Sequence, residues 1–430
     1  MTRTACDLFI DHVTLLDGSR SCIAITGNRI TAVGDANYTG ARTIDANGKL
    51  AMPSLANCHT HAAMVLMRGF GDDMPLKEWL EQRIWPAEQK LTKAACYWGT
   101  RLATLEMIRS GCTFFSDMYW NVAECAKAVQ ESGIRAMLGT IFIKFLPFEE
   151  QCAVSADLHK AGKAGEWGDR VRFCIAPHAP YTVEPSQLEW IANFAQEHDC
   201  AVHTHLSENA WEVDEIVSAQ KMRPAHFMDK LGLLKAPGGF LGAHCVWLDE
   251  SEFELFTERG ATCIHNPCAN MKLSVGTSAA RAFPYHLARK AGTRVVLGTD
   301  GVCSNNNLDL FEEMKFAALL AKHSTGDPEN MPAREALALP TTNAAAAMRQ
   351  DFGRLQAGAL ADLILVRADD VSFAPTYDFV SNVVYSANGH SVDTTICDGK
   401  VLMEGGVLPE LAEVRAKAEE CIVEMGWRNM

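Results

Sequence analysis

The feature that most constrains the fold is a series of eight short apolar segments between Pro53 and about Met348. Longer stretches separate them, and those at 92–109, 185–197 and 307–322 have helical spacing. Eight β/α units predict an α/β protein with a closed parallel (β/α)8 barrel of the TIM type. The eight predicted strands are NCHTH, TFFSDM, RAMLGTIFI, RVRFCIAP, AVHTHL, FLGAHC, ATCIHN and RVVLGTD.

Both ends of the chain have a different, strand-rich pattern. LFIDHVTLL and CIAITGNRITAVG precede the barrel, with a hairpin turn expected at Gly27 and Asn28. ADLILV and VDTTICDGKVLM follow the barrel. We therefore expect residues 1–52 and 353–430 to form one composite β-sandwich domain with a C-terminal helix, and residues 53–352 to form the barrel.

Composition excludes several classes of protein. The 430 residues carry a formal net charge of -14, without the basic footprint of a nucleic-acid binder. No apolar run approaches the ~20 residues that span a bilayer, and Asp7 and Asp11 interrupt any signal peptide. The 15 cysteines are scattered and include no C-x-x-C pair. We expect a cytoplasmic protein with reduced, mostly buried cysteines and no nucleic-acid or membrane partner.

Histidines and acids stand at the ends of several predicted strands, where the catalytic groups of such barrels are found. His59 and His61 are two residues apart, so both face the same side and can chelate one divalent ion. Each motif alone is a weak signal, but chance rarely places such residues at matching strand ends. His203 shares a face with His205 but should lie one layer deeper. The remaining strand-end residues are His178, His205, Glu208, His244 and Asp300.

Longer motifs carry a family resemblance that covers essentially the whole chain. The segment IDANGKLAMPSLANCHTHAAMVLMRGFGDDMPLKEWLEQRIWPAEQKL resembles the opening of the 5′-methylthioadenosine/S-adenosylhomocysteine deaminases, a branch of the amidohydrolase superfamily. Six further segments resemble the same family, namely IAPHAPYT, VHTHLSE, GAHCVWL, HNPCANMKL, LGTDGVCSNNNLDLFEEM and GRLQAGALADLILV.

The resemblance implies a metal-dependent deaminase that converts an adenine nucleoside into its inosine analogue and ammonia. One divalent ion, Zn²⁺ with Fe²⁺ or Mn²⁺ as alternatives, would be bound by His59, His61, His205 and Asp300. Glu208 would shuttle protons, His244 would hydrogen-bond the attacking water, and Asp300 would accept the proton of that water. His178 and Glu88 would contact the substrate, Glu88 at the ribose hydroxyls. A homo-oligomer is also implied.

The sequence departs from the family pattern in three places. Ser54 and Ala269 replace a usual glycine and serine, away from the predicted metal ligands. The family's arginine for the homocysteine carboxylate has no counterpart between residues 136 and 169, where only Lys144, Lys160 and Lys163 are cationic. Whether Lys144 replaces that arginine stays open, as does the preferred 5′ substituent.

Two alternatives remain at this point. One is a related hydrolase that acts on another ring amine or halide, such as guanine or a triazine, and the other is a non-catalytic binding protein on the same fold. Glu88 favours a nucleoside because a triazine has no ribose hydroxyls. Phe70, Trp79 and Trp85 follow the first strand and are expected in a loop that covers the site.

Overall fold

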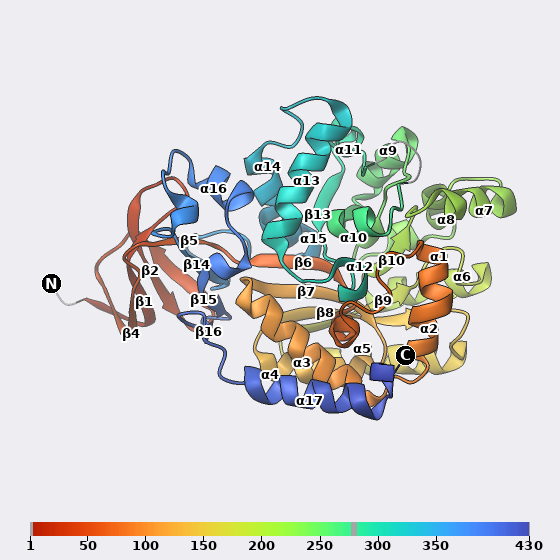
Figure 1. Ribbon diagram of the computed structural model, residues 1–430, viewed down its shortest axis with the longest axis horizontal. Coiled ribbons are helices and arrows are strands. Elements are labelled where there is room, and N and C mark those ends of the chain that lie inside the picture. The colour runs from red at the N-terminus through yellow and green to blue at the C-terminus, as the bar shows by residue number, and fades with distance from the viewer. Residues whose placement is uncertain (1–2, 277–281, 430) are drawn as a thin grey trace.

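The computed structural model describes residues 3–276 and 282–429 and contains two sheets (Figure 1). The larger part is an eight-stranded parallel barrel in the strand order β13-β12-β11-β10-β9-β8-β7-β6. A parallel bridge between Thr60 and Asp300 brings the first and last strands together. The predicted (β/α)8 barrel is therefore confirmed as a nearly closed parallel sheet.

Each predicted barrel strand is present at its expected place in the chain. Their side chains are almost entirely buried, which explains why they read as continuous apolar runs. The strands are β6 (Leu55–Thr60), β7 (Cys112–Tyr119), β8 (Arg135–Phe142), β9 (Val171–Pro177), β10 (Val202–Leu206), β11 (Phe240–His244), β12 (Thr262–His265) and β13 (Arg294–Leu297).

Helices connect successive barrel strands and form the outer layer. The three helical segments predicted from periodicity correspond to α3, α6 and α13, and Thr92 caps α3 by accepting from the backbone N–H of Ala95. The helices up to β13 are α3 (Lys93–Arg109), α4 (Val122–Ser132), α5 (Phe148–Lys163), α6 (Pro185–His198), α7 (Ala210–Gln220), α8 (Pro224–Lys230), α9 (Glu250–Arg259), α10 (Pro267–Lys272) and α11 (Tyr285–Ala291). After β13 come α12 (Val302–Asn305), α13 (Leu310–Thr325), α14 (Ala333–Ala338), α15 (Ala344–Met348), α16 (Phe379–Tyr385) and α17 (Leu411–Glu424).

An additional helical segment lies between β6 and α3. It begins with η1 (Ala62–Met67) and continues through α1 (Leu76–Trp79), η2 (Leu80–Ile84) and α2 (Trp85–Glu88). The η2 turn has π geometry and lies just before Pro86, which cannot donate the backbone hydrogen bond that a regular helix needs there. We call residues 69–91, which include α1, η2 and α2, the cap segment.

The second sheet combines strands from both ends of the chain. Its central pairing joins β5 to β14 in antiparallel register, and β1 pairs with both β4 and β5. The predicted turn at Gly27 and Asn28 connects β2 to β3. The merging of the two ends is thus confirmed, whereas the domain limits 1–52, 53–352 and 353–430 stay predictions. Its strands are β1 (Thr4–Thr14), β2 (Arg20–Thr26), β3 (Arg29–Val33), β4 (Tyr38–Asp45), β5 (Lys49–Pro53), β14 (Leu363–Arg367), β15 (Val392–Cys397) and β16 (Lys400–Met403).

The C-terminal helix returns from this sheet to the barrel, where α17 packs along α3 (Figure 1). All 15 cysteines are free, and all but Cys152 are buried. None of the helices in residues 3–276 and 282–429 combines the length and apolar character that a membrane crossing needs.

Candidate active site

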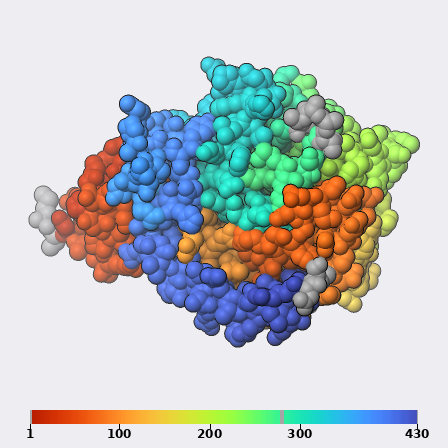
Figure 2. All heavy atoms as spheres, viewed as in Figure 1, coloured from red at the N-terminus to blue at the C-terminus, as the bar shows by residue number. Residues whose placement is uncertain are grey.

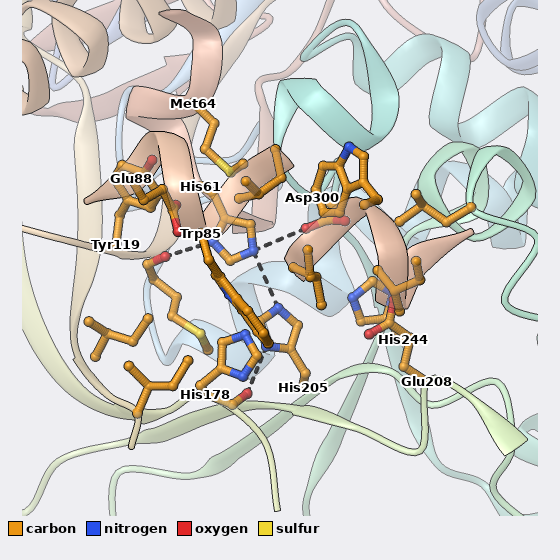
Figure 3. Close-up of a pocket in the computed structure, with 18 of the residues that line it drawn as sticks. His61, Met64, Trp85, Glu88, Tyr119, His178, His205, Glu208, His244 and Asp300 are labelled. Carbon is orange, nitrogen blue, oxygen red and sulfur yellow. Dashed lines mark hydrogen bonds and ion pairs between the residues drawn. The ribbon is translucent and has the colours of Figure 1, made fainter. Parts of the chain in front are cut away.

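One pocket at the carboxyl-terminal ends of the barrel strands collects most of the predicted site residues (Figure 3). The empty space inside it, open solvent included, is about 640 Å³. Apolar and aromatic side chains form most of its wall. The acids and imidazoles in the wall are His61, Glu88, His178, His205, Glu208, His244 and Asp300.

The backbone turns sharply where three of these strands end. Ser207, His244 and Asp300 have φ values of 49°, 72° and 62°, in the left-handed region that non-glycine residues rarely adopt. Strain of this kind persists where the surrounding structure holds it, and it concentrates at functional sites. At Gly298 a Cβ atom would lie 2.7 Å from the Cβ of His59, so glycine permits β13 to approach β6.

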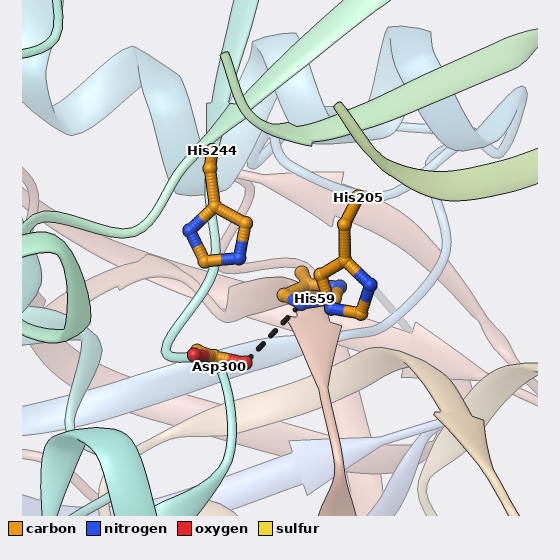
Figure 4. Close-up of side chains that lie close together, drawn as sticks. All are labelled: His59, His205, His244 and Asp300. Atoms are coloured by element: carbon orange, nitrogen blue, oxygen red, sulfur yellow. Dashed lines mark ion pairs between the residues drawn. The ribbon is translucent and has the colours of Figure 1, made fainter. Parts of the chain in front are cut away.

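Three imidazoles and a carboxylate converge beside the pocket (Figure 4). The ligand atoms of His59, His205, His244 and Asp300 all lie within 4.8 Å of one another, and all four residues are buried. His61 adjoins them, with its Nε2 3.2 Å from Asp300 Oδ1 and 3.3 Å from His205 Nε2. These nitrogen and oxygen donors suit a divalent transition metal.

The atom His59 Nε2 provides a test of that fit. It lies 3.3 Å from Asp300 Oδ1 and is buried without a hydrogen-bond partner among the described residues. The other ring nitrogen, Nδ1, is 2.9 Å from His203 Nε2, and His203 Nδ1 is 3.1 Å from Ser116 Oγ. His203 thus supports His59 from beneath, as its predicted deeper layer implies. A buried nitrogen left unpaired in this way fits a metal ligand.

The neighbouring rings are oriented in the same manner. His61 Nδ1 donates to Met118 O over 2.6 Å, and His205 Nδ1 donates to His178 O over 2.7 Å. Because a carbonyl oxygen can only accept, the Nδ1 atoms of both rings carry the proton and their Nε2 atoms can offer lone pairs. His244 Nδ1 is similarly 2.8 Å from the side-chain oxygen of Asn270.

Burial and mutual charge shift the titration of these groups. Burial lowers the pKa of His59 to about 4 and that of His178 to about 3, so both stay neutral at physiological pH. Burial opposes ionisation of Asp300, but the adjacent imidazoles of His59 and His61 hold the pKa of this carboxyl well below its usual range. Ser304 Oγ donates to Asp300 Oδ2 over 2.6 Å and orients that carboxylate. His61 differs from His59 and His178, because the Asp300 carboxylate outweighs burial and raises the pKa of this imidazole to about 9.

Glu208 enters the pocket on a loop that Glu212 holds in place. The Glu212 carboxylate accepts from the backbone N–H groups of Ser207 and Glu208 over 2.7 and 2.8 Å. Burial raises the pKa of Glu208, and its Oε1 lies 3.8 Å from His244 Nδ1. A buried carboxyl with a raised pKa can carry a proton near neutral pH.

Glu88 faces the pocket from the other side, at the end of α2. Burial raises the pKa of this carboxyl, and hydrogen bonding from the Trp120 side chain opposes the shift. Trp79 and Trp85 also line the pocket, as expected of covering aromatics. Phe70 was expected to cover the site as well, but it lines a separate hollow with residues of the C-terminal segment.

Several residues that hold the site were missed by the sequence analysis. Asn270 lies in HNPCANMKL and Glu212 lies four residues after Glu208, but neither spacing indicated the contact that it makes. Lys144 lies outside this wall and lines a neighbouring hollow with Trp85 and Phe145. Its Nζ is 5.6 Å from the centre of the Phe145 ring.

Comparison with known proteins identifies the family. Residues 50–402 match the amidohydrolase family over most of the chain. The chain belongs to that family. Amidohydrolases are metal-dependent, which agrees with the cluster around Asp300, and this amidohydrolase is a hydrolase of carbon–nitrogen bonds.

Named relatives narrow the branch and confirm the resemblance. A 5′-deoxyadenosine deaminase of Methanoregula boonei is 48% identical over 87% of this chain and 84% of its own length. A 5-methylthioadenosine/S-adenosylhomocysteine deaminase of Dictyoglomus thermophilum is 44% identical over 87% of each chain. A zinc-bound adenosine deaminase from Xanthomonas campestris, 31% identical, superposes over 100% of both chains with a TM-score of 0.92.

Proposed function

We propose that this amidohydrolase deaminates adenine nucleosides, replacing the 6-amino group with oxygen and releasing ammonia. The observation that carries the proposal is that one pocket contains a metal-type cluster, the buried acid Glu208 beside it and a second acid, Glu88, on another wall. The names of the relatives support the same substrate class. Such a pocket matches a purine at one end and a ribose at the other.

The proposed metal ligands are His59, His61, His205 and Asp300, holding one divalent ion, which we propose to be Zn²⁺. When bound, such an ion supplies a Lewis acid that lowers the pKa of its water to about 7. His244 lies close enough to act as a ligand, but we propose that its Nε2 atom accepts a hydrogen bond from the attacking water. Because His244 Nδ1 donates to Asn270, the Nε2 atom keeps its lone pair for that bond.

Two acids divide the proton transfers. Asp300 stays ionised and accepts the proton of the attacking water, which adds to C6 of the purine. Glu208, whose pKa is raised by burial, is the proposed donor of a proton to the ring nitrogen. Asp300 then passes its proton to the amino nitrogen, and the bond from C6 to that nitrogen breaks to release ammonia. The proton of the C6 hydroxyl returns to Glu208, which leaves a carbonyl at C6 and the hydrogen on the ring nitrogen.

Glu88 and His178 are the proposed substrate contacts away from the reacting atoms. A carboxylate accepts hydrogen bonds from two vicinal hydroxyls, so Glu88 selects a ribose over a free base. We expect Glu88→Ala to lower kcat/KM for nucleosides by at least ~10-fold, because a lost hydrogen bond to a charged group is worth about 1.5–3 kcal/mol. Steady-state kinetics with 5′-deoxyadenosine would measure this, and an unchanged kcat/KM would remove Glu88 from the proposal.

The pocket wall at the end of β8 is apolar and includes Ile141 and Ile143, and we propose that the 5′ end of the substrate lies against it. No arginine follows β8 up to residue 169, and Lys144 lies in the neighbouring hollow. A lysine pairs with a carboxylate as a point charge, without the two parallel hydrogen bonds of arginine. We propose that adenosine, 5′-deoxyadenosine and 5′-methylthioadenosine are deaminated at least as well as S-adenosylhomocysteine.

The decisive experiment is an ammonia-release assay on the purified holoenzyme with those four nucleosides, adenine, guanine and melamine. The proposal expects turnover of the nucleosides and poor turnover of the three free rings. Turnover of guanine or melamine alone would establish the alternative ring substrate. A metal-loaded protein that releases no ammonia from any of the seven compounds would contradict the proposed function.

A further inference from the structure

We propose that Lys272 latches the cap segment over the pocket and is thereby a positioning residue for the reaction. The kinetic part of this inference rests on the proposed function, but the structural part does not. The lysine lies in the HNPCANMKL motif, at the end of α10. Next to it, Leu273 lines the pocket.

The cap segment provides a large part of the pocket wall. Figure 3 shows Trp85 and Glu88 of α2 facing the site, and Asp72 contacts Lys272 in the segment that follows β12. In Figure 2 the orange surface that includes the cap adjoins the green surface of that segment. The cap residues in the wall are Leu76, Trp79, Leu80, Ile84, Trp85 and Glu88.

The ammonium group of Lys272 joins three chain segments. Its Nζ donates to Asp72 Oδ1 over 2.5 Å, to Cys303 O over 3.0 Å, and to the side-chain oxygen of Asn306. Asp72 belongs to the cap segment, just before α1, while Cys303 lies in α12 and Asn306 caps it. All three ammonium hydrogens therefore have an acceptor, and the lysine side chain is only 23% exposed.

A second contact fixes the root of the cap to the same point. Arg68, the last residue before the cap segment, donates to the backbone oxygen of Asn306 and pairs with Glu106 on α3. Four residues further along the chain, Asp72 of the cap segment pairs with Lys272. Because α12 directly follows Asp300, the latch connects the cap to the segment that carries the proposed metal ligand.

Most of the wall contributed by the cap is apolar, so the ion pair between Lys272 and Asp72 adds a directional contact between the cap and the segment after β12. Loss of one charge-assisted hydrogen bond shifts a local opening equilibrium by roughly tenfold. An open cap exposes Trp79, Trp85 and Glu88 to water and lowers the fraction of enzyme ready to bind substrate. Apparent affinity falls in proportion to that fraction.

The test is hydrogen–deuterium exchange of the holoenzyme, followed in peptides from residues 69–91 without substrate. We expect roughly tenfold faster exchange there in Lys272→Met and in Asp72→Asn, with no further gain in the double variant. Asp73→Asn is the matched control for the aspartate. Lys290→Met, which breaks an exposed pair with Glu250, is the control for the lysine.

Kinetics separate a latch from a general structural role. Saturating 5′-deoxyadenosine should restore slow exchange in both latch variants, with kcat retained within about twofold and KM raised only by the factor by which the closed fraction falls. Unchanged exchange in Asp72→Asn, or equal effects in the two controls, would overturn the latch. If the latch variants exchange faster in the cap segment but the unmodified protein deaminates no nucleoside, the latch is supported and only the proposed function is refuted.

Discussion

Glu208 shows how one residue gains its function from its surroundings. The loop on which it lies is held by the buried Glu212, and burial raises the pKa of Glu208 itself. We expect Glu208→Gln to lower kcat by at least ~100-fold while the bound metal stays unchanged, because the amide cannot carry the proton. Ammonia release and metal analysis of the same sample would measure both.

The matched control is Glu215→Gln, an exposed carboxylate on α7, the helix that follows Glu208. It should retain full activity. Asp300→Asn should lose both activity and metal, since Asp300 is the proposed ligand as well as the proposed base. Near-normal kcat in Glu208→Gln would exclude its proposed role as the proton shuttle.

Glu313 is a second buried acid, but it lies behind the site. Its carboxylate accepts from Cys268 N over 3.2 Å and from Asn305 Nδ2 over 2.5 Å, so it connects α10 to the end of α12. Burial raises its pKa from 4.5 to about 8. The folded protein thus binds more protons than the unfolded chain in that window, and this group makes stability fall as pH rises.

We therefore expect Glu313→Gln to flatten the pH dependence of stability. Between about pH 5 and pH 8, its Tm should decline less than that of the unmodified protein, because the amide has no proton to lose. Differential scanning calorimetry at a series of pH values would measure the slope. Glu312→Gln, at the adjacent half-buried position, is the control, and identical slopes in all three proteins would contradict the prediction.

At the scale of elements, one buried ion cluster joins the barrel to the second sheet. Arg135, the first residue of β8, donates from Nε to Asp362 Oδ2 over 2.7 Å and from Nη2 to Asp398 Oδ1 over 2.5 Å. Asp362 directly precedes β14 and Asp398 directly follows β15. The arginine and Asp362 are 3% and 0% exposed, so neither charge has an alternative partner in water.

Arg135→Met should lower the free energy of unfolding by about 3–5 kcal/mol, because it leaves the buried carboxylate of Asp362 and the partly exposed carboxylate of Asp398 without their cation. Urea denaturation at neutral pH would measure the loss. The comparison is Arg354→Met, which breaks an exposed pair with Asp351 and should cost no more than about 1 kcal/mol. Equal effects of the two substitutions would show that Arg135 does not join the two sheets energetically.

At the scale of the whole molecule, the metal should couple activity to stability. Its proposed ligands come from β6, β10 and β13 or from the residues that directly follow these strands, so one ion ties together distant parts of the barrel. We expect chelation to abolish ammonia release and to lower the Tm. The lost stabilisation is on the order of 4 kcal/mol when free metal stands at about 1,000 times its Kd.

One equivalent of Zn²⁺ should restore both properties, as measured by metal titration with parallel activity and calorimetry. A requirement for two tightly bound ions would contradict the mononuclear site. Full activity and an unchanged Tm in the chelated, metal-free protein would contradict the metal site altogether.

Much of this architecture was predictable because it depends on local pattern. Apolar runs of strand length, helical periodicity and their eightfold alternation are short-range properties, and they predicted the barrel and the place of each strand. His59, His61, His205 and Asp300 could be selected together because the ends of parallel barrel strands meet at one face. The separate sheet followed from the strand-rich ends, although its pairing of β5 with β14 spans more than 300 residues.

Only the tertiary structure decided which loop residues meet around those strand ends. The pairs His244–Asn270, Lys272–Asp72 and Arg135–Asp362 depend on how separate loops and strands are placed in space, and no periodicity encodes a contact between them. The same applies to Phe70, whose apolar character suited the pocket equally well but whose backbone leads it toward the C-terminal segment. Strand-end chemistry is set by local spacing, whereas orientation, burial and the shift of each pKa arise from packing between distant segments.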